Sequence, residues 1–174
     1  KFRYKLKKNL VLTGMMGVGK STIGKDLAGK LDMRFKDVDK IIEEKLSLSI
    51  ADIFEKKGEA FFRKIEEEET LNHIKEKNAV VALGGGAFMS EKIRENTKKL
   101  CISVWLDLEP KHLFPRIKMN KRRPLLNSKS SEQDLKNLYE KRKKTYSLAN
   151  YKIDCNLKTR NEVVKEILKI YENI

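Results

Sequence analysis

A glycine-rich run at residues 14–22 most constrains the fold of this chain. It reads Gly-Met-Met-Gly-Val-Gly-Lys-Ser-Thr and matches G-x-x-x-x-G-K-[ST] at every fixed position. The apolar run 10–12 precedes it, and residues 23–31 carry a helical stripe after it. A strand, a glycine loop and a helix in this order can wrap a phosphate with backbone N–H groups. We expect Lys20 to reach the β- and γ-phosphates of a nucleotide and Ser21 to ligate Mg²⁺.

Length and composition indicate one globular domain. The chain has 174 residues, which suffices for one core and is short for two. It contains no apolar run of membrane-spanning length, and residues 1–5 lack the apolar stretch of a signal peptide. Cys101 and Cys155 lie in short apolar or β-prone runs, so we expect buried, reduced thiols. These features predict a single domain over 1–174 in the cytoplasm, without a membrane partner.

The net charge of +14 is unevenly distributed along the chain. Segment 111–144 has twelve Lys and Arg against three acids, whereas segment 37–69 has six against eleven. A nucleic-acid-binding protein shows such a basic stretch, and so does a lysine-rich surface around a phosphorylated ligand. Few aromatic residues interrupt the basic stretches, which favours the second interpretation and predicts no obligatory nucleic-acid partner.

Short β-type runs alternate with helical stretches, which implies a parallel sheet covered by helices on both faces. The segments Ser49–Asp52 and Thr159–Glu162 have the form of capping boxes and are expected to open helices. The polar, basic stretch 118–131 has no helical period and is predicted to be a mobile lid. The predicted strands are 10–12, 33–35, 79–83, 101–106 and 151–155.

Asp37 and Asp39 follow the second predicted strand at a spacing of two. Side chains at this spacing point the same way from an extended chain. One carboxylate would then hold a Mg²⁺-bound water, and the other would take a proton from an attacking hydroxyl. The alternative is a polar loop with two helix-capping acids.

Arg63 and Glu66 are neighbours on one helical face because they are three residues apart. A buried glutamate would orient Arg63 toward a carboxylate ligand, although such pairs also occur as surface salt bridges. Gly84–Gly86 ends the third predicted strand, where many phosphate-loop NTPases carry an aspartate. Glycines there let an anionic ligand approach the backbone, which argues against a motor or a switch.

Two further arginines are candidate phosphate or carboxylate ligands. Arg142 continues the apolar stripe formed by Leu135, Leu138 and Tyr139, so it is predicted to point inward and to need an anionic partner. Arg123 lies in the predicted lid and would close on the transferring phosphoryl group, unless it is a solvated loop residue.

Taken in order, these motifs resemble the shikimate kinase family from about Leu10 to the last helix. The resemblance implies a nucleoside-monophosphate-kinase-like α/β fold: a five-stranded parallel sheet of order 2-3-1-4-5 between helices, with a mobile lid and substrate-binding helices at about 38–77. The motifs that carry it are the phosphate loop at 14–22, D-x-D at 37–39, F-R-x-x-E at 62–66, G-G-G at 84–86, R-P-L at 123–125 and Arg142.

The resemblance also implies roles for individual residues. Asp39 would be the general base and contact the acceptor, and Asp37 would hold the metal through water. Arg116 and Arg160 would lie near the adenine, although Pro115 departs from the family pattern by removing an N–H inside the expected helix. The other implied nucleotide contacts are Gly14, Gly17, Val18, Gly19, Lys20, Ser21, Thr22 and Arg123. The other implied acceptor contacts are Arg63, Gly84, Gly85, Gly86 and Arg142.

The activity implied by the resemblance is Mg²⁺-dependent transfer of the ATP γ-phosphoryl group to the 3-hydroxyl of shikimate, a step of aromatic amino-acid biosynthesis, by a monomer. One alternative is another small-molecule kinase of this fold, acting on gluconate or a nucleoside monophosphate. A different class remains open as well: a basic nucleotide- or nucleic-acid-binding protein without catalysis.

Overall fold

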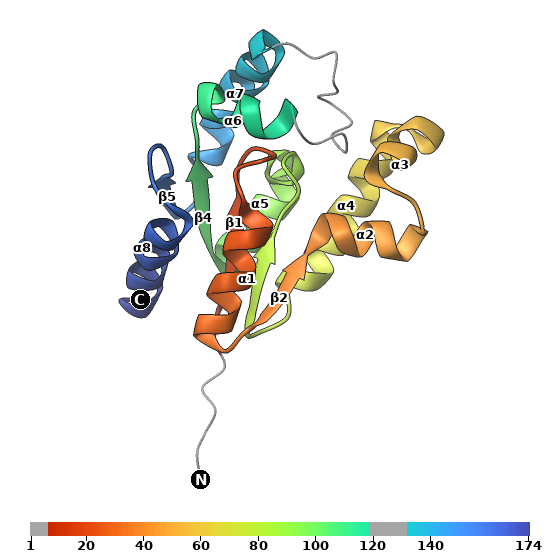
Figure 1. The fold of residues 1–174 in the computed structure, drawn as a ribbon. Helices are drawn as coiled ribbons and strands as arrows, with labels where there is room; N and C mark the ends of the chain where they lie inside the picture. The colour runs from red at the N-terminus through yellow and green to blue at the C-terminus, as the bar shows by residue number, and fades with distance from the viewer. Residues whose placement is uncertain (1–6, 119–131) are drawn as a thin grey trace.

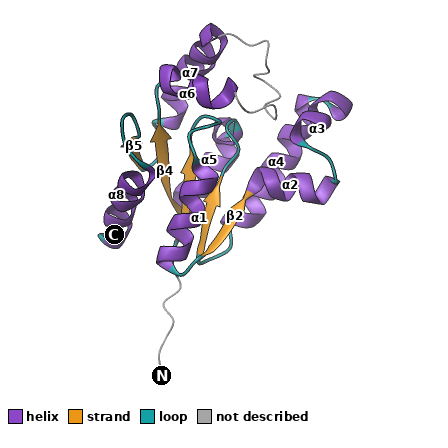
Figure 2. Ribbon diagram, in the orientation of Figure 1, coloured by secondary structure: helices purple, strands orange, loops and turns teal. Residues whose placement is uncertain are grey.

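The computed structural model describes residues 7–118 and 132–174, which form a five-stranded parallel sheet with helices on both faces (Figure 1 and Figure 2). The strand order is β2-β3-β1-β4-β5, and all four neighbouring pairs run parallel. The predicted order 2-3-1-4-5 is confirmed. The strands are β1 (Asn9–Thr13), β2 (Arg34–Asp37), β3 (Ala79–Ala82), β4 (Cys101–Asp107) and β5 (Tyr151–Asp154).

The three central strands, β1, β3 and β4, are buried along their whole length, as expected for a parallel sheet that is covered on both faces. The edge strand β2 starts at Arg34, one residue later than predicted. Met33 donates its backbone N–H to the Ala28 carbonyl at 2.9 Å, so it completes the end of the preceding helix. Because Met33 takes part in the C-terminal capping of α1, β2 begins one residue later.

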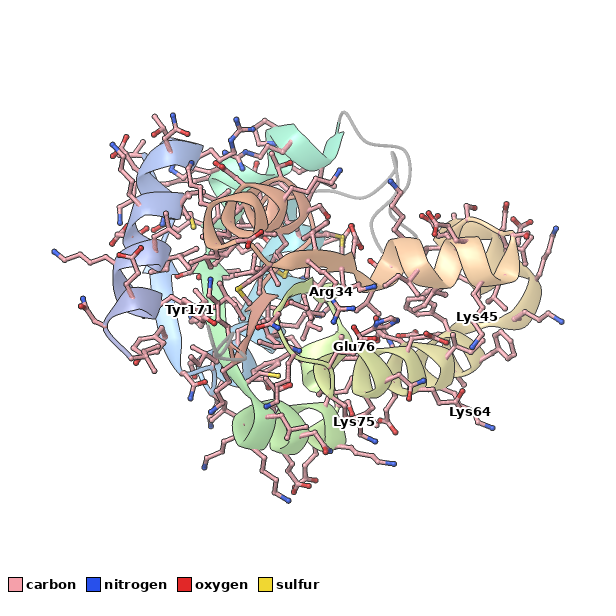
Figure 3. The ribbon with its side chains drawn as sticks, turned by 90° about the horizontal axis from the view of Figure 1, so that it is seen from below. Arg34, Lys45, Lys64, Lys75, Glu76 and Tyr171 are labelled. Carbon is pink, nitrogen blue, oxygen red and sulfur yellow. The ribbon has the colours of Figure 1, made fainter. Side chains whose placement is uncertain are left out.

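Helices α1 (Lys20–Leu31) and α8 (Arg160–Glu172) cover one face of the sheet, and α4 (Glu59–Ile74) and α5 (Glu91–Leu100) cover the other, as the view from below in Figure 3 shows. Helices α2 (Val38–Leu46) and α3 (Ile50–Lys57) pack on α4 beyond the β2 edge. The remaining elements are the 3₁₀ helix η1 (Ala87–Met89), α6 (Pro110–Lys118) and α7 (Glu132–Tyr146).

Several local predictions are confirmed. Thr159 and Glu162 form a reciprocal capping box at the start of α8, and the Ser49 hydroxyl caps α3.

Cys101 and Cys155 are free and buried, and burial raises their thiol pKa values to about 11 and about 12. Both thiols therefore stay protonated and unreactive near neutral pH. In the described ranges no helix is long and apolar enough to cross a bilayer.

The prediction that Asp37 and Asp39 share one extended segment is wrong. Strand β2 ends at Asp37 and α2 begins at Val38, so Asp39 lies in the first helical turn. The physical reason is that the Asp37 carboxylate accepts the backbone N–H of Lys40 at 3.2 Å and so acts as an N-cap. The predicted lid 118–131, with Arg123, falls outside the described residues apart from the backbone of residue 118.

Asn9, the first residue of β1, connects this strand to α4 and β3. Its side chain is fully buried; its Nδ2 donates to the Ile74 carbonyl at 3.3 Å, and its Oδ1 accepts from the Ala79 backbone N–H at 2.9 Å. Asn9 therefore ties the start of β1, the strand that leads into the glycine loop, to the end of α4 and the start of β3.

Asn9→Ala should lower the free energy of unfolding by about 1–3 kcal/mol, because it leaves the buried Ala79 N–H without a partner. Urea denaturation measures this loss. Asn96→Ala is the control, since that amide donates to Lys92 on an exposed helix surface and its loss should change stability by less than about 0.5 kcal/mol. Equal effects of the two substitutions would contradict the assigned role of Asn9.

Candidate active site

The glycine loop turns from β1 directly into the N-terminus of α1. Gly14 and Gly19 have φ angles of +143° and +103°, which L side chains rarely adopt. A Cβ at Gly14 would also lie 2.6 Å from the Leu106 carbonyl oxygen. These positions therefore require glycine, and they leave the helix N-terminus open to a phosphate group.

Lys20 and Ser21 lie at the start of α1, beside the glycine loop. The Lys20 ammonium donates to the carbonyls of Gly14 and Met15 at 2.6 and 2.9 Å, so it arches over the loop. The Ser21 hydroxyl donates to Asp37 Oδ2 at 2.5 Å. Lys20 and Ser21 line an open cavity of about 570 Å³ together with Asp39 of α2 and Gly17 and Gly19 of the loop.

The pairing of Ser21 with Asp37 suits Mg²⁺, which prefers oxygen ligands and retains several waters. Within 7–118 and 132–174, no cluster of three or more His, Cys, Asp or Glu side chains could hold an ion alone. A hydroxyl, a carboxylate and the phosphates of a bound nucleotide together supply the donors that Mg²⁺ needs, so the residues present fit this ion.

The Gly84–Gly86 turn is where the side chains of three helices meet. A Cβ at Gly84 would lie 2.5 Å from Asp39 Oδ1 and 2.8 Å from Glu66 Oε2. A Cβ at Gly86 would lie 2.5 Å from Arg63 Nη1, and one at Gly85 would lie 3.3 Å from the Arg142 guanidinium. Charged groups from α2, α4 and α7 therefore pack directly on the backbone of this turn, and a side chain at Gly84 or Gly86 would displace them.

Arg63 is oriented by a buried carboxylate, as its spacing predicts. Its Nη1 donates to Glu66 Oε1 at 2.8 Å, and the Glu66 side chain is only 3% exposed. Burial raises the pKa of Glu66, and the positive charges of Arg63 and Arg142 oppose that rise. The pair is therefore no surface salt bridge: it aims a guanidinium at the glycine turn.

Arg142 points inward from α7, which confirms the prediction from the helical stripe. The residue is 5% exposed, whereas its neighbours Lys141 and Lys143 are exposed. Among the described residues, Arg142 Nη1 has no hydrogen-bond partner. A buried guanidinium is costly unless an anion pairs with it, so this donor is suited to an anionic ligand.

Arg63 and Arg142 line one open cavity of about 890 Å³, which also contacts Glu66 and Gly86. The two guanidinium groups therefore face one cavity and contact neighbouring residues of the same glycine turn. Gly85 lies between this cavity and the phosphate loop, because its Cβ position is 3.3 Å from Arg142 Nη1 and 3.4 Å from the Met16 nitrogen. An anion at the arginines would thus lie next to a nucleotide held by the loop.

Arg116 and Arg160 gather on the other side of the loop, where they line a cavity of about 200 Å³ with Val18 and Thr22. Helix α6 continues through Pro115, and Arg116 Nη1 donates to the Val18 carbonyl at 3.4 Å. Pro115 therefore does not turn Arg116 away from the loop. Arg123 lies outside the described residues, so its predicted position stays a prediction.

Sequence reasoning missed one residue of this site, Tyr146. It is fully buried, and its hydroxyl donates to the Gly85 carbonyl. The signal that could have found it is its spacing, because Tyr146 follows Arg142 by four residues and so shares its helical face.

Comparison with known proteins agrees with this geometry. The shikimate kinase family model matches residues 16–172. A shikimate kinase from Sulfurihydrogenibium sp. (strain YO3AOP1) is 44% identical over 161 residues, which are 92% of this chain and 96% of that protein. The solved shikimate kinase from Acinetobacter baumannii in complex with shikimate has a TM-score of 0.90 and 36% identity, covering 96% of this chain and 94% of the other.

The crystal structure of shikimate kinase from Aquifex aeolicus vf5 is also similar, with a TM-score of 0.84 and 40% identity over 95% of this chain and 96% of that one. The family match spans nearly all of the described domain, including residues 16–22 of the glycine loop, the turn at 84–86 and α7. The chain therefore belongs to the shikimate kinase family.

Proposed function

We propose that the protein transfers the γ-phosphoryl group of ATP to the 3-hydroxyl of shikimate and releases ADP and shikimate 3-phosphate. The observation that carries this proposal is the convergence of Arg63 and Arg142 beside the phosphate loop, with the Gly85 backbone between them and the nucleotide side. Two guanidinium groups in one cavity suit a carboxylate acceptor, and the family relative solved with shikimate supports this choice of acceptor.

Arg63 and Arg142 would bind the shikimate carboxylate, and the N–H groups of the Gly84–Gly86 turn would add backbone contacts. Asp39 would contact the acceptor hydroxyls, because its carboxylate reaches the same turn from the first turn of α2. The acceptor would thus be held at its carboxylate end by α4 and α7 and at its hydroxyl end by α2.

In the reaction the acceptor oxygen attacks the γ-phosphorus, and the bond from that phosphorus to the β–γ bridging oxygen breaks. Asp39 would take the proton of the attacking hydroxyl, and the electron pair of the broken bond leaves with ADP. Lys20 and the loop N–H groups would bind the phosphate oxygens on which negative charge develops. Arg123 would add a further positive charge there.

Ser21 would ligate Mg²⁺ directly, and Asp37 would hold it through water. When bound, the ion neutralises charge on the β- and γ-phosphate oxygens. Arg116 and Arg160 would flank the adenine from the cavity beside Val18.

The protein would act as a monomer, as the resemblance to the family implies. A cytoplasmic location would suit its use of ATP and its two free thiols.

An acceptor panel tests the proposed reaction. ADP release should require shikimate and should be negligible with gluconate or a nucleoside monophosphate, because the hydroxyls of gluconate lie on an open chain and a nucleoside monophosphate has no carboxylate for the two arginines. Turnover with gluconate or a nucleoside monophosphate, but not with shikimate, would overturn the acceptor. Salt-sensitive RNA or DNA binding without ATP turnover would instead support the non-catalytic alternative.

Asp39→Asn should lower kcat by about 10²–10⁴-fold, because the amide cannot accept the proton. ATP binding, measured by calorimetry, should be unchanged. Asp26→Asn is the control, since Asp26 pairs only with Lys30 on the surface of α1 among the contacts described for it, and it should leave kcat as it is. Near-normal kcat in Asp39→Asn would show that another group is the base.

Arg142→Met should raise the KM for shikimate by about 10–100-fold, which corresponds to the loss of a charge-assisted hydrogen bond. The KM for ATP should not change, and the melting temperature of the ligand-free protein should not fall, because the buried guanidinium is replaced by an apolar chain. Lys144→Met is the control on the exposed face of α7. An unchanged KM for shikimate would argue against the carboxylate clamp.

A further inference from the structure

We propose that Tyr146 is a positioning residue of the acceptor site, whose hydroxyl fixes the Gly84–Gly86 turn in the orientation that binds the acceptor. The inference rests on the proposed function and deepens it. Tyr146 ends α7 one turn after Arg142, is fully buried, and donates its hydroxyl proton to the Gly85 carbonyl.

The three carbonyl groups of the glycine turn are each held, but by different partners. The Gly84 carbonyl accepts the Ala87 N–H and the Gly86 carbonyl accepts the Met89 N–H, both at 3.1 Å within the backbone of η1. The Gly85 carbonyl accepts the Tyr146 hydroxyl. A side chain thus fixes the middle peptide of a segment that, as three glycines, has little conformational preference of its own.

Fixing this carbonyl also fixes a donor on the acceptor side. The Gly85 carbonyl and the Gly86 N–H belong to one planar trans peptide, so they point in opposite directions and turn together. Gly86 packs against the Arg63 guanidinium, and Gly85 packs against the Arg142 guanidinium. The Tyr146 hydroxyl therefore sets the direction of the N–H of Gly86, a residue that lines the same cavity as the two arginines.

The residues around Tyr146 fix the position of its ring and favour the protonated form of its hydroxyl. The ring lies 5.8 Å from Trp105, measured between ring centroids, and the hydroxyl oxygen is 3.8 Å from the sulfur of Met15 in the phosphate loop. Burial raises the phenol pKa, and the positive charge of Arg142, a side-chain hydrogen bond with Arg142 and the positive charge of Arg63 oppose the rise. The hydroxyl thus remains a donor at neutral pH.

A purely structural role would be to anchor α7 to the sheet, and Tyr139 provides the matched comparison. Tyr139 lies two turns earlier on the same helix, and its hydroxyl donates to Asp107 Oδ1 at 2.7 Å, at the end of β4. It anchors the same helix without contacting the glycine turn. The two tyrosines therefore separate helix anchoring from turn positioning.

The experiment compares Tyr146→Phe with Tyr139→Phe in the full chain, with kcat and both KM values measured for ATP and shikimate and with melting temperatures recorded. We expect both substitutions to lower the melting temperature. Only Tyr146→Phe should raise the KM for shikimate, by about tenfold, as for one lost hydrogen bond, while the KM for ATP stays within about twofold. An unchanged KM for shikimate, or an equal rise in both variants, would overturn the inference.

Gly85→Ala provides a second variant in case Tyr146→Phe does not fold. It keeps the hydroxyl but places a Cβ 3.3 Å from Arg142 Nη1 and 3.4 Å from the Met16 nitrogen, so the Gly85 peptide or the Arg142 guanidinium must shift. The KM for shikimate should rise again, and an unchanged value would overturn the inference. Absence of shikimate-dependent ADP release by the unaltered protein would contradict the proposed function, whereas normal release with wild-type KM values in the variants would contradict only the role of Tyr146.

Discussion

The Arg142 guanidinium is buried against the Gly84–Gly86 turn, and the acceptor side of the site depends on how this buried charge is compensated. Removing such a charge from water costs several kcal/mol unless an oppositely charged group compensates. Glu66 supplies negative charge nearby, but its Oε1 accepts from Arg63, and among the described residues neither its Oε2 nor Arg142 Nη1 has a hydrogen-bond partner. The arrangement is best completed by a bound anion, so the free site carries a cost that ligand binding relieves.

The parallel sheet brings the two halves of the site together. The chain leaves β1, β2 and β3 at the same edge, so the glycine loop, Asp37 and the glycine turn become neighbours there. Backbone groups and one lysine make the phosphate side, whereas side chains from α2, α4 and α7 make the acceptor side. The nucleotide half is therefore fixed by a local motif, and the choice of acceptor depends on helices that flank the sheet.

Sequence reasoning succeeded where one periodicity applied to a segment. It failed at Asp39, where strand alternation and helix N-capping made different predictions. The helical stripe predicted the inward direction of Arg142, and the spacing of three predicted the Arg63–Glu66 pair. The spacing of two misplaced Asp39, because that rule holds only for an extended chain. The capping preference of Asp37 started a helix at the next residue and rotated Asp39 onto it.

By itself the sequence determined the phosphate loop, the alternation of strands and helices, and which arginine of a basic cluster faces inward. These features can be read from fixed spacings and periodicity among residues that are close together in the sequence, so they do not depend on contacts between distant segments. The tertiary structure alone decided that Arg63 and Arg142 share one cavity and that Tyr146 holds the Gly85 carbonyl. Those contacts join segments far apart in the chain, and they exist only because the strand order and the packing of α4 and α7 on it bring both helices to the same glycine turn.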